Sequence, residues 1–360
     1  MAVIYPDYEA LLERVSASAA STRTLGVTID GAPIVAARGG GDKQPGIFIT
    51  AGSHSTEQAG VSAAVDLIAG LDTEHEVHVI PTRDPVGLNG FAHVLSLGMG
   101  ETPSFETFDE VEDILRREGA VLFEEEGMVL SLIGDFGYVS RRPDNGWCPQ
   151  WSAYKRLQKL RQENPQALEP LMGRRVYMTP GQTGVEGTGD FGRAYTLIFS
   201  PEGEVLHINR FHDTAWAPVE PRVTVRLMQE IRPGISFDLH ESQLMEDRFW
   251  LSARTQADPE NQQWEARAAT EIIAAIAASG GTLAEDDDTH MPWFDQSEKA
   301  VFWLDANRRG EGLNLMDFAS RYHGLAFGTE MGMYGSFEHR VGLALTTVKT
   351  AVSVFEERYR

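Results

Sequence analysis

The feature that most constrains the fold is a strand–helix–strand unit near the start of the chain. "GIFITAG" (46–52) is a continuous apolar run bounded by glycine, which is typical of a strand buried on both faces. A helix is predicted from about Glu57 to Leu71, and a second apolar strand follows in "EVHVIPTRDP" (76–85). This spacing indicates a βαβ unit, which requires a largely parallel sheet with helices packed on it.

The same alternation returns in the second half of the chain. "GISFDLHES" (234–242) and "GLAFGTEMG" (324–332) are predicted buried strands with polar residues near their carboxyl ends. Predicted helices and a hairpin complete the pattern: helices over 7–20, 219–231, 259–278 and 337–356, and a hairpin turned at Asp30-Gly31. We therefore expect an α/β fold with a mixed, largely parallel sheet, forming a single catalytic domain over residues 1–360.

The alternation is interrupted between about residues 95 and 189. This stretch contains a predicted acidic helix (about 105–118), a hairpin-like "AVLFEEEGMVLSL" (120–132) and a charged helix "SAYKRLQKLRQEN" (152–164). We interpret 95–189 as an α+β insertion and a candidate lid. "GEVLHINRF" (203–211) is then expected to resume the strand pattern.

Charge and composition exclude several classes of function. The formal net charge of −22 over 360 residues argues against binding nucleic acid or an anionic membrane surface. A single cysteine, Cys148, leaves no intrachain disulfide. The opening "MAVIYPDYEALLERV" lacks the basic and apolar regions of a signal peptide, and no run approaches the roughly 18 apolar residues of a membrane span. We expect a cytoplasmic protein.

Chemically capable residues gather where predicted strands end, which is the edge at which open α/β sheets bind ligands. They are His54, Glu57, Asp84, Asn209, Arg210, Asp238, His240 and Glu330. Two histidines and one carboxylate form a set typical of catalytic zinc, so His54, Glu57 and His240 are candidate metal ligands. Three of these residues also have a structural alternative: a helix-start glutamate for Glu57, a core histidine bonded to Asp238 for His240, and an exposed strand end for Glu330.

The order of these motifs resembles the carboxypeptidase A-like zinc metallocarboxypeptidase family, from about Gly46 to the C-terminal helix and excluding the insertion. The resemblance implies a mixed eight-stranded sheet with helices on both faces. It also implies one Zn²⁺ per chain, bound by His54, Glu57 and His240. The remaining roles that the resemblance implies are substrate-carboxylate binding by Asn209 and Arg210, general-base catalysis by Glu330, and oxyanion stabilisation by Arg193.

The implied reaction is zinc-dependent cleavage of a C-terminal amide bond in a peptide or peptide-like substrate, with zinc-bound water activated by Glu330. The planar guanidinium of Arg210 matches a carboxylate in a way that lysine cannot. The expected partner is therefore a small substrate with a free carboxylate.

Three positions depart from the family pattern. His207 stands where the family commonly has an aspartate that orients a zinc-binding histidine, so we expect the surroundings of that ligand to be built differently. Asp84 replaces the asparagine of an Asn-Pro-Asp-Gly turn. The family's mobile tyrosine has no clear counterpart, since "DANRRGEG" (305–312) occupies that region.

Two alternatives stay open. One is an N-acyl amino acid deacylase resembling aspartoacylase and succinylglutamate desuccinylase, which share His-x-x-Glu, "NRFH" (209–212) and "DLH" (238–240) with this chain. The other is a non-catalytic protein that binds peptide C-termini. Manganese or cobalt are alternatives to zinc for the same ligand types.

Overall fold

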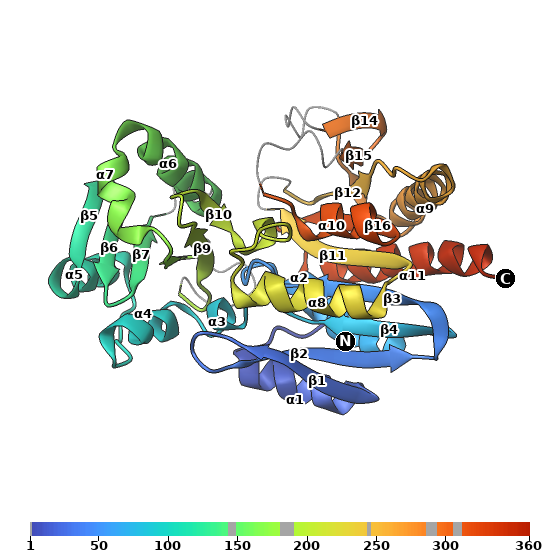
Figure 1. Ribbon diagram of the computed structural model, residues 1–360, viewed down its shortest axis with the longest axis horizontal. Helices are drawn as coiled ribbons and strands as arrows, with labels where there is room; N and C mark the ends of the chain where they lie inside the picture. The colour runs from blue at the N-terminus through green and yellow to red at the C-terminus, as the bar shows by residue number, and fades with distance from the viewer. Residues whose placement is uncertain (1, 143–148, 181–190, 243–245, 286–293, 305–311) are drawn as a thin grey trace.

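Two β-sheets organise the chain (Figure 1). The computed structural model describes residues 2–142, 149–180, 191–242, 246–285, 294–304 and 312–360. The larger sheet runs in the order β1-β2-β4-β3-β11-β16-β12-β15-β14, with β13 paired to β12. Its strands are β1 (Ser21–Val27), β2 (Pro33–Gly40), β3 (Lys43–Ala51), β4 (His75–Ile80), β11 (Ile235–Ser242), β12 (Arg248–Arg254), β13 (Thr282–Leu283), β14 (Phe294–Glu298), β15 (Val301–Leu304) and β16 (Leu325–Gly332).

Helices account for most of the remaining chain. They are α1 (Tyr8–Ser18), α2 (Gln58–Gly70), α3 (Pro85–Leu88), α4 (Phe91–Met99), α5 (Phe108–Glu118), α6 (Pro149–Glu163), α7 (Pro165–Leu168), α8 (Val219–Ile231), α9 (Pro259–Ala278), α10 (Leu315–Tyr322) and α11 (Phe337–Arg358), with short 3-10 turns η1 (Glu169–Leu171) and η3 (Ile208–Arg210). In the described part of the chain, no helix combines the length and hydropathy that a membrane crossing requires.

The centre of the larger sheet is parallel. β4, β3, β11 and β16 run side by side in the same direction, and α2 connects β3 to β4 as the predicted βαβ unit. The pairs β1–β2, β2–β4, β12–β16 and β14–β15 are antiparallel. The predicted mixed α/β class is confirmed. The described sheet has ten strands rather than the expected eight, and β13 and the β14–β15 pair extend it alongside β12.

Helices pack on both faces of this sheet, and alternate residues of β11 show how the faces differ. Ile235, Phe237 and Leu239 pack in the apolar core beneath α1, α2, α9 and α11. Because side chains alternate along a strand, Asp238 and His240 point to the opposite face. That face is covered by α8 and α10, whose apolar residues form a second cluster (Figure 1). The polar residues of β11 therefore share one side of the sheet.

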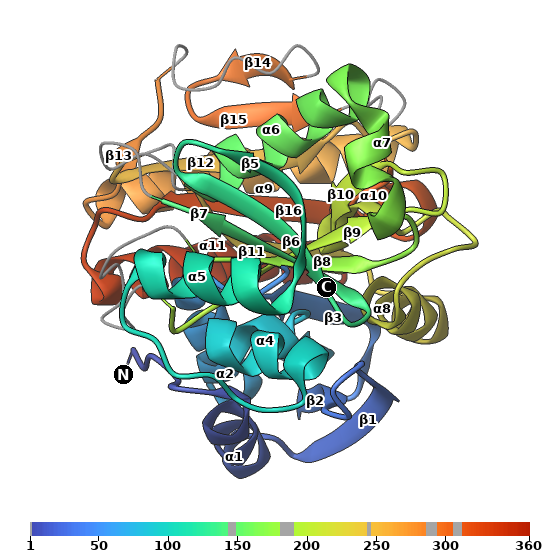
Figure 2. The ribbon, with the colours of Figure 1, turned by 90° about the vertical axis from the view of Figure 1, so that its left-hand side faces the viewer.

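The smaller sheet lies beside the carboxyl-end edge of the larger one, as Figures 1 and 2 show from two directions. Its order is β10-β9-β8-β7-β6-β5. The strands are β5 (Ala120–Glu125), β6 (Met128–Ile133), β7 (Phe136–Arg141), β8 (Arg175–Met178), β9 (Tyr195–Phe199) and β10 (Val205–His207). α5 packs against β5, β6 and β7, while α6 contacts β7 and β10.

The segment "GEVLHINRF" resumes the strand pattern as expected, but it does so in the smaller sheet. Val205–His207 forms β10, which pairs antiparallel with β9 in the smaller sheet. The two strands are joined by a tight turn in which Gly203 N donates to Ser200 O, so a local hairpin forms instead of a long-range pairing. The smaller sheet thus continues past residue 189. The assignment of 95–189 as an insertion and lid stays a prediction.

Asp84 begins α3 in a fully buried position at the end of the β4 segment. Its Oδ1 accepts a hydrogen bond from the backbone N–H of Gly87 at 3.0 Å. Burial raises the pKa of this carboxyl to about 7, from an ordinary value of 3.8. The folded state therefore binds this proton more tightly than the unfolded chain does.

This difference predicts a pH-dependent stability. The contribution of Asp84 to the free energy of unfolding is most favourable below about pH 4 and is lost as the pH rises through 7. Above pH 4 the unfolded chain releases the proton of Asp84, whereas the folded state must either keep that proton or bury the charged carboxylate. Asp84→Asn keeps the cap without the ionisable group. We expect the variant to exceed the wild type in free energy of unfolding at pH 8, by on the order of 1–3 kcal/mol, with little gain at pH 4. Urea unfolding at both pH values measures this, and an equal difference at the two pH values would contradict it.

Candidate active site

The turn between β3 and α2 places the first two candidate ligands. Gly52 has a φ of +57°, and a Cβ at this position would lie 2.5 Å from Thr82 Oγ1, so the close turn requires glycine. Beyond it, the N–H of Glu57 donates to the carbonyl of His54 at 3.1 Å. The two side chains meet across this turn, with His54 Nδ1 lying 2.6 Å from Glu57 Oε1.

The third candidate ligand comes from the neighbouring strand. β11 runs parallel to β3, and the last paired residues are Ala51 and Leu239. His240 therefore projects just beyond the end of β3, and its Nδ1 lies 2.8 Å from Glu57 Oε2. One carboxylate thus faces two imidazole nitrogens that lie 186 positions apart in sequence.

These three groups fit a metal ion. One ligand atom from each of His54, Glu57 and His240 lies within 4.8 Å of the others. Two imidazole nitrogens and a carboxylate are ligands that catalytic zinc uses, with a fourth position left for water or substrate. The geometry is thus consistent with the predicted ligand set.

The electrostatics of the three groups depend on their mutual contacts. Burial opposes a charge on Glu57, but His54 and His240 outweigh it and lower its pKa to about 2. Burial lowers the pKa of His54, with Glu57 opposing. For His240, burial also disfavours the charged form, but Asp238 and Glu57 together raise its pKa well above the ordinary value. Glu57 is therefore an anion, and a proton on His240 supplies positive charge between two carboxylates.

His240 is held from behind by a buried polar network. Its Nε2 lies 2.9 Å from Asp238 Oδ2, and the same oxygen accepts hydrogen bonds from Arg83 Nη2 at 2.5 Å and from Asn209 Nδ2 at 3.1 Å. Burial alone would raise the pKa of Asp238, but Arg83 and His240 lower it. Asp238 is therefore an anion that fixes the orientation of the His240 ring.

Arg83 belongs to the site although no sequence motif indicates it. It is completely buried, and it also donates to Asn209 Oδ1 at 3.2 Å. A single arginine in "PTRDP" belongs to no motif. Only its position in the sequence indicated a role in the site, because Arg83 is a positive charge at a strand end in a strongly acidic chain.

Asn209 and Arg210, predicted to bind the substrate carboxylate, lie in η3 directly after β10. Asn209 is buried, and its Oδ1 also accepts from the N–H of Leu315 at 3.1 Å. Its contacts with protein groups make it part of the network around Asp238. Arg210 is only partly buried, and its positive charge acts on both His54 and Glu330.

Glu330, the predicted general base, lies next to His240 in the sheet. The parallel pairing of β11 with β16 puts His240 opposite Glu330, so both side chains point to the same face. Burial raises the pKa of Glu330 to about 8; His240 lowers it in part, and the charges of Glu57 and Asp238 raise it further. The structure therefore brings this residue to the metal-ligand cluster.

Arg193 is engaged elsewhere. Its guanidinium donates to the backbone carbonyls of Tyr5, Pro6, Leu88 and Gly192 at 2.5–3.1 Å. These bonds connect the N-terminal segment, α3 and the approach to β9. The predicted role of Arg193 in stabilising an oxyanion stays a prediction. Residues 305–311, which make up most of the segment expected at the place of the family's mobile tyrosine, lie outside the described residues.

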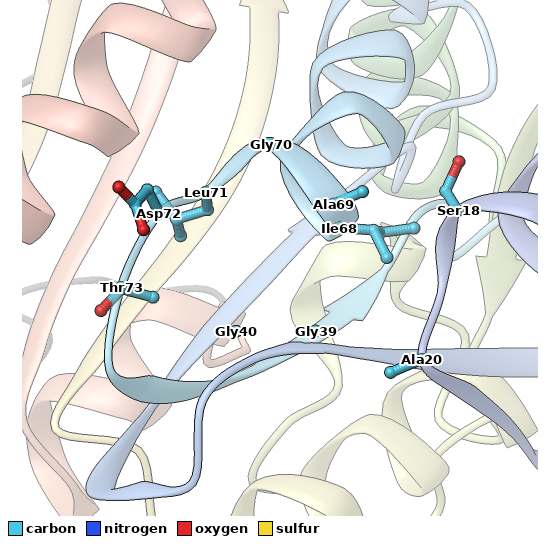
Figure 3. Close-up of a pocket in the computed structure, with 10 residues that line it drawn as sticks. All are labelled: Ser18, Ala20, Gly39, Gly40, Ile68, Ala69, Gly70, Leu71, Asp72 and Thr73. Carbon is cyan, nitrogen blue, oxygen red and sulfur yellow. The ribbon is translucent and has the colours of Figure 1, made fainter.

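A surface pocket lies at the other end of α2, roughly 20 Å along the helix from Glu57. Asp72 is the one titratable group that lines it, so this pocket offers no set of metal ligands. It is separate from the candidate site. Its lining residues are Ser18, Ala20, Gly39, Gly40, Ile68, Ala69, Gly70, Leu71, Asp72 and Thr73 (Figure 3).

Two solved structures illustrate the similarity of this chain to known proteins. One, described as "a putative metallopeptidase", is from Shewanella denitrificans; it is 13% identical with a TM-score of 0.52, over 97% of this chain and 90% of that chain. A metallo-carboxypeptidase from Pseudomonas aeruginosa is 12% identical with a TM-score of 0.48, over 97% of this chain and 68% of that chain. No protein-family model matches the chain, and no curated protein does.

At these identities the similarity establishes the fold, and the Shewanella protein carries that argument. The predicted resemblance is supported at the level of fold by this solved structure, which is described as "a putative metallopeptidase". The fold and the cluster of His54, Glu57 and His240 together fit a zinc hydrolase.

Metal binding at this cluster should release protons. A metal ligand must be a neutral imidazole, whereas the pKa of His240 is raised, so Zn²⁺ should displace about one proton near pH 6–7. The affinity for Zn²⁺ should therefore rise with pH until His240 is neutral in the metal-free protein. Calorimetric titration in two buffers of different ionisation enthalpy measures the proton count. An affinity that does not change with pH would contradict this prediction.

His240→Ala is the companion variant for that titration. It removes one of three ligands, so stoichiometric zinc binding should be lost. His78→Ala on β4 is the control, since His78 contacts Glu76 and lies outside the cluster. Zinc retained at one equivalent by His240→Ala would remove His240 from the ligand set.

Proposed function

We propose that this protein is a zinc-dependent hydrolase that cleaves the C-terminal amide bond of a peptide or peptide-like substrate. The observation that carries this proposal is the meeting of the His54, Glu57 and His240 ligand atoms beside Glu330 at the carboxyl ends of β3, β11 and β16. A metal ligand set and a separate carboxyl group on one face provide the two components that metal-assisted hydrolysis requires.

In this proposal Nδ1 of His54, the carboxylate of Glu57 and Nδ1 of His240 hold the ion. Zinc, when bound, would polarise the scissile carbonyl and acidify water. Glu330 takes the proton from the attacking water and returns it to the leaving amine. A carboxyl group whose pKa is raised towards neutrality is suited to both transfers.

Arg210 is the residue proposed to bind the substrate's terminal carboxylate. It lies close enough to affect the charge of Glu330, and its fork of N–H donors matches a carboxylate. Asn209 is proposed to assist. A contact between its amide and the substrate would compete with its contacts to Arg83, Asp238 and Leu315.

The first experiment separates this function from its alternatives. Zinc-loaded protein, with and without chelator, is given N-terminally blocked peptides together with N-acyl amino acids, and the products are identified by mass spectrometry. Chelator-sensitive release of single C-terminal residues is expected. Cleavage of the N-acyl amino acids alone would identify a deacylase instead, and zinc binding without any product would favour a non-catalytic binder.

Glu330→Gln tests the base. The variant should bind zinc as the wild type does but lose turnover by at least about 100-fold, because the side chain no longer accepts a proton. Glu338→Gln, at an exposed position on α11, is the matched control and should keep full activity. Turnover within a few fold of wild type in Glu330→Gln would exclude it as the base.

Arg210→Ala tests recognition of the carboxylate. The wild type should prefer a peptide acid over the matching peptide amide, and the variant should lose about 10- to 100-fold of that preference, the range expected for a hydrogen bond to a charged group. The ratio of kcat/KM for the two substrates measures the effect. An unchanged ratio would assign the carboxylate to another group.

A further inference from the structure

We propose that His207 is a positioning residue for the metal ligand His54, and that it acts as an uncharged hydrogen-bond acceptor supplied by the smaller sheet. The inference rests on the proposed metal site and concerns how one ligand is held there. His207 is the last residue of β10, whereas His54 follows β3 of the larger sheet. The proposal therefore gives the smaller sheet a direct part in the site.

The contacts that support this role come from three elements. His207 Nδ1 lies 2.9 Å from His54 Nε2. Tyr195, the first residue of β9, stacks on the His54 ring with centroids 5.1 Å apart and an interplanar angle of 19°. Tyr154 of α6 packs edge-on against His207 with centroids 5.8 Å apart. His207, Tyr195 and Tyr154 are all buried, so the His54 ring has a fixed wall on this side.

The direction of the hydrogen bond follows from the chemistry of imidazole. His54 turns Nδ1 towards Glu57, the neighbouring candidate ligand. Nδ1 is therefore the nitrogen of His54 that is placed to bind a metal. When Nδ1 uses its lone pair there, the ring proton must be on Nε2. Nε2–H then donates to His207 Nδ1, which has to be unprotonated to accept it. His207 thereby selects the tautomer of His54 that can bind a metal.

The two histidine ligands are consequently supported in different ways. His240 has an anionic acceptor, because its Nε2 lies 2.9 Å from the carboxylate of Asp238. His54 has a neutral imidazole at the corresponding nitrogen. A carboxylate makes a ligating histidine more basic and adds negative charge near the ion. The support of His54 should therefore give a lower metal affinity than a carboxylate would.

The test uses three variants with the zinc affinity of each measured by competition with a chelating dye at one fixed pH. Asn and Asp are matched in shape, and the first oxygen of either side chain can replace Nδ1 as the acceptor. His207→Asn should bind zinc within about 3-fold of wild type. His207→Asp should bind about 10-fold more tightly than His207→Asn, and His207→Ala should bind about 10- to 100-fold more weakly than wild type.

A second readout is independent of affinity and turnover. The visible absorption of the cobalt-substituted protein reports the ligand field, so His207→Asp should shift the bands relative to His207→Asn. His78→Ala is the control and should match the wild type in both measurements. If His207→Ala does not fold, the Asn and Asp variants still decide the question, because they retain an acceptor.

The outcomes separate this inference from the proposed function. Wild-type protein that binds no zinc would overturn the metal site itself. Wild-type protein that binds zinc while His207→Ala binds it equally well would overturn the positioning role and leave the site intact. Equal affinities of the Asn and Asp variants would overturn the claim that an uncharged acceptor sets the affinity.

Discussion

The parallel pairing of β3 with β11 is the constraint on which the rest of the site depends. Parallel neighbours end at the same edge, so His54 and His240 meet there although 186 positions separate them. The pairing of β11 with β16 extends the row to Glu330. The apolar residues of the same strands pack against α2, α9 and α11 on the opposite face. The same strand register therefore places the apolar side chains in the core and the polar side chains in the site. A slip of the register by one residue would turn the apolar side chains towards the site and the polar side chains towards the core.

A charge network behind the ligands compensates for their burial. Arg83 and Asp238 are both almost fully buried, and an unpaired ion in such a place would be strongly destabilising. Asn209 joins the pair to His240. Glu57 is also held by the protein, because its Oε2 accepts a hydrogen bond from the backbone N–H of Glu241. The carboxylate of Glu241 in turn accepts a hydrogen bond from the first turn of α2 and pairs with Arg340. The ligands are held by bonds from several elements, so the geometry is established by folding.

Much of the fold was predictable because its signals are local. Apolar runs predicted β3, β11 and β16, and the rule that parallel strands share an edge then predicted that His54, His240 and Glu330 converge. The pairing of β10 was not predictable, since Val205–His207 is too short to specify its neighbour by pattern. The partner of Arg83 is 155 positions away, and nothing in the neighbouring sequence indicates it. The contact of His207 with His54 depends on the pairing of β10, so it was not predictable from the sequence pattern either.

The hydrogen bonds of Arg193 make the first residues of the chain part of the interior architecture. Two of the carbonyls that accept from its buried guanidinium belong to Tyr5 and Pro6, ahead of the first helix. Tyr8 N–H continues the connection by donating to Asn89. Removal of the residues ahead of α1 would take away two of the acceptors of this buried guanidinium. The segment ahead of α1 is therefore part of the folded structure, and shortening the chain to the start of α1 should destabilise the protein.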